Sequence, residues 1–212
     1  MKNKVVLSNK TYQKTTFIVL SIIILFVGLF IYYASNYSTA NSDLLPQSLV
    51  NSKEKLSSIS KSINDLNQEL AQKIIDIQNA DKSNNPKLAL SLIDQAQNIN
   101  AQMKSQNNEL KSNLQILQSS LNNLNNPPVM QMVADAIQSK KLLIEEFGNY
   151  TNLMDNFLTS LKTAISSPTS QNKQNVNNII QAINNKINTI NNLNKNFNAT
   201  YNQIQTTLQT TK

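Results

Sequence analysis

The side-chain types that carry most enzyme chemistry are nearly missing from this sequence. Its 212 residues include no Cys and no His, and the only glycines are Gly28 and Gly148. Without Cys and His, neither a Ser-His-Asp nor a Cys-His arrangement can be built. A Ser–Lys pair is formally possible, but no motif with special turn geometry accompanies one, and phosphate-binding loops need more glycine. We therefore expect a protein that is not an enzyme and that binds no cofactor.

Carboxylates are the remaining candidates for a metal site. Asp65 and Glu69 are four residues apart and would share one face of a helix, whereas the adjacent Glu145 and Glu146 would diverge. Metal sites in helical bundles combine such carboxylates with Glu-x-x-His pairs, and this sequence has no His. Apolar positions flank both pairs, so we interpret them as solvated surface and predict no metal site.

The basic charge indicates membrane topology rather than a polyanionic partner. The formal net charge is +7, and four lysines, at positions 2, 4, 10 and 14, precede a long apolar segment with no acidic residue among them. Nucleic-acid-binding proteins typically cluster Arg and Lys beside aromatic residues, and every basic residue here is Lys. We predict no nucleic-acid partner.

The apolar segment predicts a single transmembrane helix. Residues 17–33 are almost entirely apolar and would reach roughly 25 Å as a helix. We assign the membrane helix to residues 15–37 and expect it to contact the lipid bilayer. Lysines mark the cytoplasmic side of such a helix. Residues 1–14 would therefore form a short basic cytoplasmic N-terminus and residues 38–43 a juxtamembrane linker, with the rest of the chain outside the cell membrane.

A cleaved secretory signal is the alternative interpretation of the same segment. Small residues just before Asn41 would suit cleavage near Ala40, which would release a secreted domain. The apolar run is longer than the usual stretch of about 7–15 residues in such a signal. We therefore favour a retained, single-pass anchor.

Prolines divide the remaining chain into near-equal parts. Their spacings are 40, 41 and 41 residues, at Pro46, Pro86, Pro127 and Pro168. Proline is favoured in the first turn of a helix. Good N-cap residues directly precede three of these prolines and lie three residues before the other: Asn85, Asn126, Ser167 and Asp43. We therefore predict four helices, over residues 44–80, 86–124, 127–165 and 168–210.

Apolar residues recur with helical spacing in each of these segments, as Ile183 and Ile190 do in the fourth. No window alternates with the period of a strand. Because short connections favour antiparallel neighbours, we predict an all-α fold in which residues 44–212 form an antiparallel up-down-up-down four-helix bundle. Extended helical hairpins or a coiled coil are the alternative. The turns at 80–85 and 166–171 would lie at the tip farthest from the membrane.

Three polar residues interrupt the apolar stripes. Gln106, Lys140 and Asn194 lie about 20, 25 and 26 residues from the tip along their helices, so one or two layers of the bundle could contain all three. We predict a buried polar layer formed by these residues. Buried polar residues in helical seams can specify register at a cost in stability, and we favour that structural role over a ligand pocket.

Two classes of function stay open. We expect a membrane-anchored structural or protein-interaction module of the cell envelope that binds a protein partner, or itself, through helical faces. Doubled apolar positions such as Leu142-Leu143 favour surplus apolar surface and hence association.

The layout also resembles the sensor portion of bacterial chemoreceptors with four-helix ligand-binding domains. In those receptors a membrane helix precedes an extracytoplasmic bundle, and the segment Leu44-Leu45-Pro46 fits that layout. The resemblance implies the alternative function, a ligand-binding sensor. The second membrane helix and the signalling region of those receptors have no counterpart after Thr211, so such a sensor would signal through a partner protein.

Overall fold

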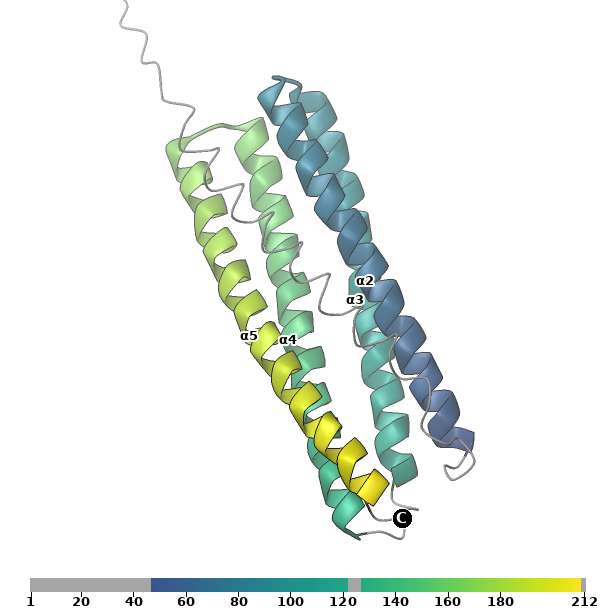
Figure 1. Ribbon diagram of the computed structural model, residues 1–212. Coiled ribbons are helices and arrows are strands. Elements are labelled where there is room, and N and C mark those ends of the chain that lie inside the picture. Colours follow the sequence, from purple (N-terminus) through teal and green to yellow (C-terminus); the bar gives the residue numbers. More distant parts are fainter. Residues whose placement is uncertain (1–46, 122–126, 211–212) are drawn as a thin grey trace, which may run out of the picture.

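The computed structural model describes residues 47–121 and 127–210, and four long helices account for nearly all of them (Figure 1). The helices are α2 (Gln47–Lys82), α3 (Pro86–Leu121), α4 (Pro127–Ser166) and α5 (Ser170–Thr210). The described ranges contain no strand, which confirms the all-helical prediction for this part. None of these four helices is long and apolar enough to cross a membrane. The predicted membrane helix at 15–37 and the predicted caps Asp43 and Asn126 lie outside the described residues.

The turn between α2 and α3 confirms the predicted start of the second helix. The Leu88 backbone N–H donates to Asn85 Oδ1 at 3.1 Å, as expected of an N-cap, and Pro86 is the first helical residue. The Asn85 N–H donates to the Ala80 carbonyl at 2.9 Å and closes the last turn of α2. Between the two helices Asn84 has a φ of 55°, a left-handed conformation that Asn tolerates better than most residues.

The turn between α4 and α5 corrects the predicted start of the fourth helix. We predicted a start at Pro168 with Ser167 as the cap, whereas α5 begins at Ser170. Thr169 occupies the cap position instead, because its Oγ1 accepts the Asn172 backbone N–H at 3.1 Å. The Ser167 carbonyl accepts the Thr169 N–H at 2.9 Å, so Ser167 belongs to the turn that precedes the cap.

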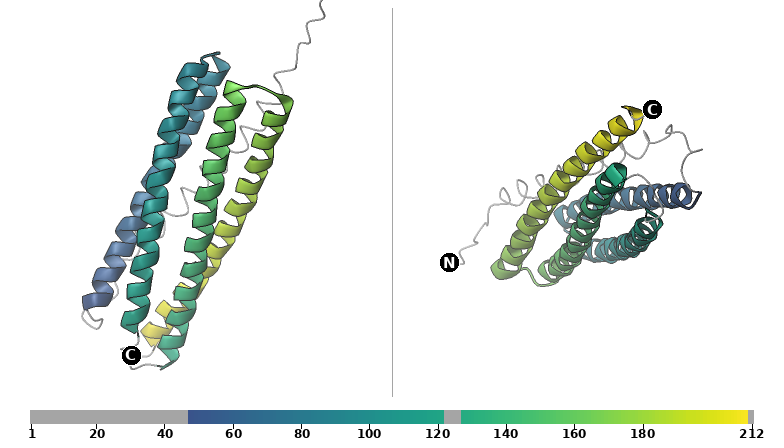
Figure 2. Two further views of the ribbon diagram at one scale, coloured as in Figure 1. Left: turned by 180° about the vertical axis from the view of Figure 1, so that it is seen from behind. Right: turned by 90° about the horizontal axis from the view of Figure 1, so that it is seen from below.

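Successive helices run in opposite directions, and the α2–α3 and α4–α5 turns lie at the same end of the molecule (Figure 1). Within the described ranges α2 packs along α3, α4 packs along α5, and the two hairpins meet mainly where α3 packs against α4. Contact between α2 and α5 is at most marginal, and the end view shows these two helices apart (Figure 2). The fold is therefore a helical bundle assembled from two hairpins.

Apolar side chains from all four helices fill the interior. Leu70 of α2, Ile93 of α3, Leu158 of α4 and Ile187 of α5 are almost completely buried. Burying a side chain of this size contributes roughly 1.5–3 kcal/mol. Asn is a poor helix former, so the Asn-rich α5 is held in place mainly by burial of its apolar stripe rather than by intrinsic propensity.

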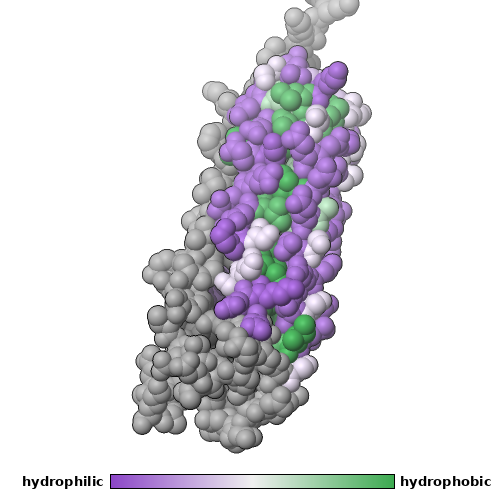
Figure 3. Space-filling view, turned by 90° about the vertical axis from the view of Figure 1, so that its right-hand side faces the viewer, coloured by the Kyte–Doolittle hydropathy of each residue, from purple (hydrophilic) through white to green (hydrophobic). Residues whose placement is uncertain are grey.

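The outer surface is mainly polar. Figure 3 shows the side formed by α2 and α3, where hydrophilic residues cover most of the described surface and apolar residues form a narrow line. In the described ranges three large apolar side chains stay exposed, Leu88 by 47%, Ile116 by 56% and Leu142 by 41%. Leu143, which follows Leu142, is buried. The surplus apolar surface suggested by the doubled positions is therefore limited, among the described residues.

Candidate functional site

The three residues predicted to form a polar layer lie on three different helices. Gln106 on α3, Lys140 on α4 and Asn194 on α5 are all half-buried. Of these three, Lys140 lines a cavity in the bundle, whereas Gln106 and Asn194 do not. The buried polar side chains that the structure describes belong to other residues, so a layer shared by these three residues stays a prediction.

The cavity beside Lys140 is small and apolar. Each helix contributes to its wall, with Ile63 from α2, Leu110 from α3, Phe147 from α4 and Ile190 from α5. Its volume of about 10 Å³ leaves room for about one water molecule. In the described conformation this cavity therefore cannot hold a metabolite.

The Lys140 side chain lines this cavity, and its amine lies beside an aromatic ring. Its Nζ lies 5.2 Å from the centroid of the Phe197 ring, a cation–π geometry between α4 and α5. Desolvation by burial lowers the pKa of Lys140 from 10.5 to about 8. The charged amine is therefore less favourable here than in water, although the aromatic ring compensates for part of the loss.

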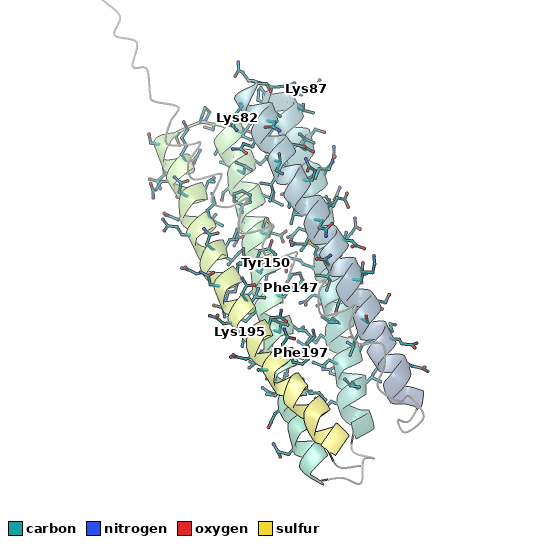
Figure 4. The ribbon with its side chains drawn as sticks, in the orientation of Figure 1. Lys82, Lys87, Phe147, Tyr150, Lys195 and Phe197 are labelled. Atoms are coloured by element: carbon teal, nitrogen blue, oxygen red, sulfur yellow. The ribbon has the colours of Figure 1, made fainter. Side chains whose placement is uncertain are left out.

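Tyr150 crosses from α4 to α2 in the middle of the bundle. Its hydroxyl donates a hydrogen bond to Asn67 Oδ1 at 3.3 Å, and both residues are buried. The Phe147 ring stacks on the Tyr150 ring, with centroids 5.7 Å apart (Figure 4). Burial raises the pKa of Tyr150 above its ordinary value, so Tyr150 acts as a neutral hydrogen-bond donor rather than as a base.

A second polar contact joins α3 to α4. Asn100 is buried, and its Nδ2 donates to the Thr151 carbonyl at 2.8 Å and to the Asp155 carboxylate at 2.5 Å. The same carboxylate forms an ion pair with Lys104, which lies one turn beyond Asn100 on α3. One carboxylate thus accepts hydrogen bonds from two α3 side chains, which links the two hairpins.

Two turns farther from the tip, Asn107 repeats this contact. Its Nδ2 donates to the Ile144 carbonyl at 3.1 Å. Gly148 lies on the following turn of α4, where an added Cβ would approach Asn107 Nδ2 to 3.2 Å. The α4 helix continues through Gly148 without a break. The missing side chain therefore lets the Asn107 amide lie close to the α4 backbone.

Several buried amide oxygens accept no hydrogen bond from another protein atom. They are the Oδ1 atoms of Asn64, Asn100, Asn107 and Asn184. Buried polar atoms are nearly always hydrogen-bonded to protein or to ordered water, and an amide oxygen can only accept. The amide nitrogens of Asn100 and Asn107 both donate to α4, which fixes the direction of those two amides and leaves their oxygens as acceptors.

The polar contacts form a level that the sequence prediction missed. Asn67, Asn100 and Tyr150 come from three different helices, and these residues and Asn184 of the fourth helix lie roughly four turns from the tip. The predicted residues were chosen because they interrupt the apolar stripes, whereas these residues flank the stripes. The spacing of seven between Asn100 and Asn107 was a usable signal, but asparagines are so frequent in this sequence that many such spacings occur.

The site is suited to hydrogen bonding and packing. Asp65, considered as a metal ligand, forms an exposed ion pair with Lys61 at 2.7 Å, and Glu146 forms a half-buried ion pair with Lys186. Among the described residues no group of three His, Cys, Asp or Glu side chains could hold a metal ion. The described carboxylates that form ion pairs therefore join neighbouring helices or link residues on one face of the same helix.

Comparison with known proteins does not identify this site. Models of protein families, curated proteins and solved structures were compared with the chain, and none of them matches it. The proposals below therefore depend on the described contacts and on the sequence.

Proposed function

We propose that this protein is a membrane-anchored, extracytoplasmic helical bundle that acts as a structural or protein-interaction module of the cell envelope. Residues 15–37 would anchor it in the lipid bilayer with residues 1–14 in the cytoplasm. The four helices would project outward and present helical faces and a polar tip to a protein partner or to a second copy of the chain.

The direction of the bundle is the observation that supports this proposal. The α2–α3 and α4–α5 turns lie at one end, and the start of α2, which follows the predicted anchor, lies at the other (Figure 1). A helix of 36 residues such as α2 is about 54 Å long, so the tip would lie that far from the bilayer. Every residue from 81 to 88 is exposed, and Lys82 and Lys87 lie at this tip (Figure 4).

The alternative, a ligand-binding sensor that signals through a partner, has less support. The cavity among all four helices has a volume of about 10 Å³, which suits one water molecule rather than a metabolite. A sensor function would require the bundle to open around its ligand.

Topology is tested first, and a chain without cysteine allows single-cysteine labelling. We expect Lys87→Cys to react with a membrane-impermeant maleimide on intact cells, and Ser8→Cys to react only after permeabilisation. The opposite pattern would contradict the proposed orientation. A soluble protein beginning at Asn41 in the medium would instead support the cleaved-signal alternative.

Association is tested by sedimentation of the full chain in detergent micelles. If exposed apolar side chains mediate self-association, Leu142→Glu should shift the oligomer toward monomer, because a charge then replaces a side chain that is 41% exposed. Gln138→Glu, an exposed position one turn earlier on α4, is the matched control and should leave the oligomer unchanged. A monomer at all concentrations that gains thermal stability with one metabolite would favour the sensor.

A further inference from the structure

The two hairpins are joined less extensively than each is held together internally. Within the described ranges, α2 packs along α3 and α4 along α5, whereas the hairpins meet mainly through one helix pair, α3 and α4. In a closed bundle, α2 and α5 would form a second interface between the hairpins, but their contact is at most marginal (Figure 2). Separation of the hairpins therefore disrupts one main helix interface, together with the Tyr150–Asn67 hydrogen bond between α4 and α2, and leaves the two interfaces within the hairpins intact.

The α3–α4 interface contains buried polar side chains. Asn100 and Asn107 are both buried and donate across it to the Thr151 and Ile144 carbonyls, yet the Oδ1 atoms of both asparagines have no hydrogen-bond partner. When the interface opens, both oxygens become accessible to bulk water. Part of the desolvation cost of the closed state is thereby recovered.

The charged contacts between the hairpins add little resistance to separation. Asp94 and Lys162 form an ion pair between α3 and α4 at 2.6 Å, with side chains exposed by 57% and 45%. Asp155 and Lys104, the other α3–α4 pair, are exposed by 42% and 33%. Ion pairs with this much solvent contact contribute little to stability, because water replaces each partner readily.

We propose that the α2–α3 and α4–α5 hairpins separate along the α3–α4 interface as intact units, before the helices themselves unfold. Proteins commonly open in cooperative units that coincide with such helical hairpins. The separated state exposes the apolar stripes of both hairpins while their backbone hydrogen bonds stay formed. It is a conformational change available to the fold whether or not the chain serves as an interaction module.

Distance measurements between spin labels test this directly in the full chain, because no native cysteine competes for the label. The four label positions are exposed, lie at nearly the same level and occupy one helix each: Gln68, Gln102, Asn152 and Asn185. The first two form a pair within one hairpin, and the last two form a pair within the other. The pair Gln102 and Asn152 spans the α3–α4 interface.

We expect a second, longer distance to grow with urea only in the pair that spans the interface, while helix content measured by circular dichroism stays constant. The two pairs within hairpins should keep a single distance over that range. The proposal is overturned if the spanning pair keeps one distance until the helix content falls. It is equally overturned if all three pairs broaden together with the loss of helix.

A matched pair of variants tests the role of the polar interface. Asn107 and Asn113 are on the same helix and each is 7% exposed, but Asn113 Nδ2 donates to the Glu109 carbonyl of its own helix at 2.8 Å. Asn107→Leu removes a buried unpaired oxygen from the interface. It should therefore reduce the long-distance population about fivefold to tenfold, whereas Asn113→Leu should leave it unchanged. Equal effects of both variants, or an increase with Asn107→Leu, would refute the interface argument.

Discussion

Replacing Lys140 by Met should stabilise the protein, and the gain should depend on pH. Lys140 lines an apolar cavity and its Nζ lies 5.2 Å from the centroid of the Phe197 ring, and Met has a similar length without the charge. The substitution leaves the methylene packing largely in place and removes the cost of desolvating an ammonium group. We therefore expect the Met variant to be more stable at neutral pH.

The size of the gain follows from the pKa. A fall in the pKa of Lys140 from 10.5 to about 8 corresponds to about 3.4 kcal/mol of preference for the neutral amine, at about 1.36 kcal/mol per unit. The residue is only half-buried, which lowers this cost, and the cation–π contact with Phe197 contributes about 0.5–1 kcal/mol in the opposite direction. We expect a net gain of about 1–2 kcal/mol, or about 3–6 °C in Tm for a chain of this size.

The sign of the pH dependence is determined by the same pKa. The folded-state pKa of Lys140, about 8, is below the unfolded value, so between about pH 8 and 10.5 only the unfolded state binds the proton. Unfolding free energy of the native sequence therefore rises over that range, and the advantage of Met shrinks. The pKa of Tyr150 is raised by burial, which favours unfolding above about pH 10, so the measurement should stay below that pH.

Thermal melts of the full chain in detergent, followed by far-ultraviolet circular dichroism at about pH 7 and about pH 9.5, measure both effects. Lys141→Met, at the exposed neighbouring position, is the control and should change Tm little at either pH. The reasoning is refuted if Lys140→Met has the same or a lower Tm at pH 7. It is also refuted if the difference in Tm is the same at both pH values.

Substitutions at three further positions, Asn84, Asn85 and Gly148, test the turn and the close approach of α3 and α4 by thermal melts. Asn85→Ala removes the cap of the Leu88 N–H and should cost about 1 kcal/mol; an unchanged Tm would argue against the cap. Asn84 has a φ of 55°, so Asn84→Ala should cost about 1 kcal/mol whereas Asn84→Gly should not, and equal effects would argue against strain. Gly148→Ala should be neutral or destabilising beside Asn107 but should gain about 1 kcal/mol in an Asn107→Ala background; simple additivity would exclude the contact.

The sequence predicts the helices well because their limits depend on local chemistry. Asn85 and Pro86 form a cap and a first helical residue without help from distant contacts. The prediction for the fourth helix was wrong by two residues because Thr169 competes with Ser167 for the cap, and proline spacing cannot rank two neighbouring hydroxyl residues. Which helices pack closely is a tertiary property, so the marginal contact between α2 and α5 could not be inferred from four similar apolar stripes.

The candidate site was harder to predict for a different reason. An amphipathic helix in a bundle buries a wider stripe than the two seam positions of each heptad, so flanking residues such as Asn64 and Asn67 also become buried. Lys140 was selected as a seam interruption, and it does line the central cavity. Asn100 and Asn107 were not selected, because their burial depends on α4 approaching closely at Gly148, which no pattern within α3 can reveal.

The apolar contacts stabilise the bundle, whereas the polar contacts specify how its helices are aligned. Buried Leu and Ile side chains stabilise the bundle, but apolar stripes tolerate a shift of one helix past another because most apolar contacts can be replaced by similar ones. The Asn100 and Asn107 amides donate to particular α4 carbonyls at 2.8 Å and 3.1 Å, and a shift by one turn would bring Asn107 against a residue other than Gly148. We infer that these amides specify the register of α3 against α4. The same two residues carry two of the four buried oxygens that accept no hydrogen bond from the protein, so the interface that defines the register is also the one along which we propose that the hairpins separate.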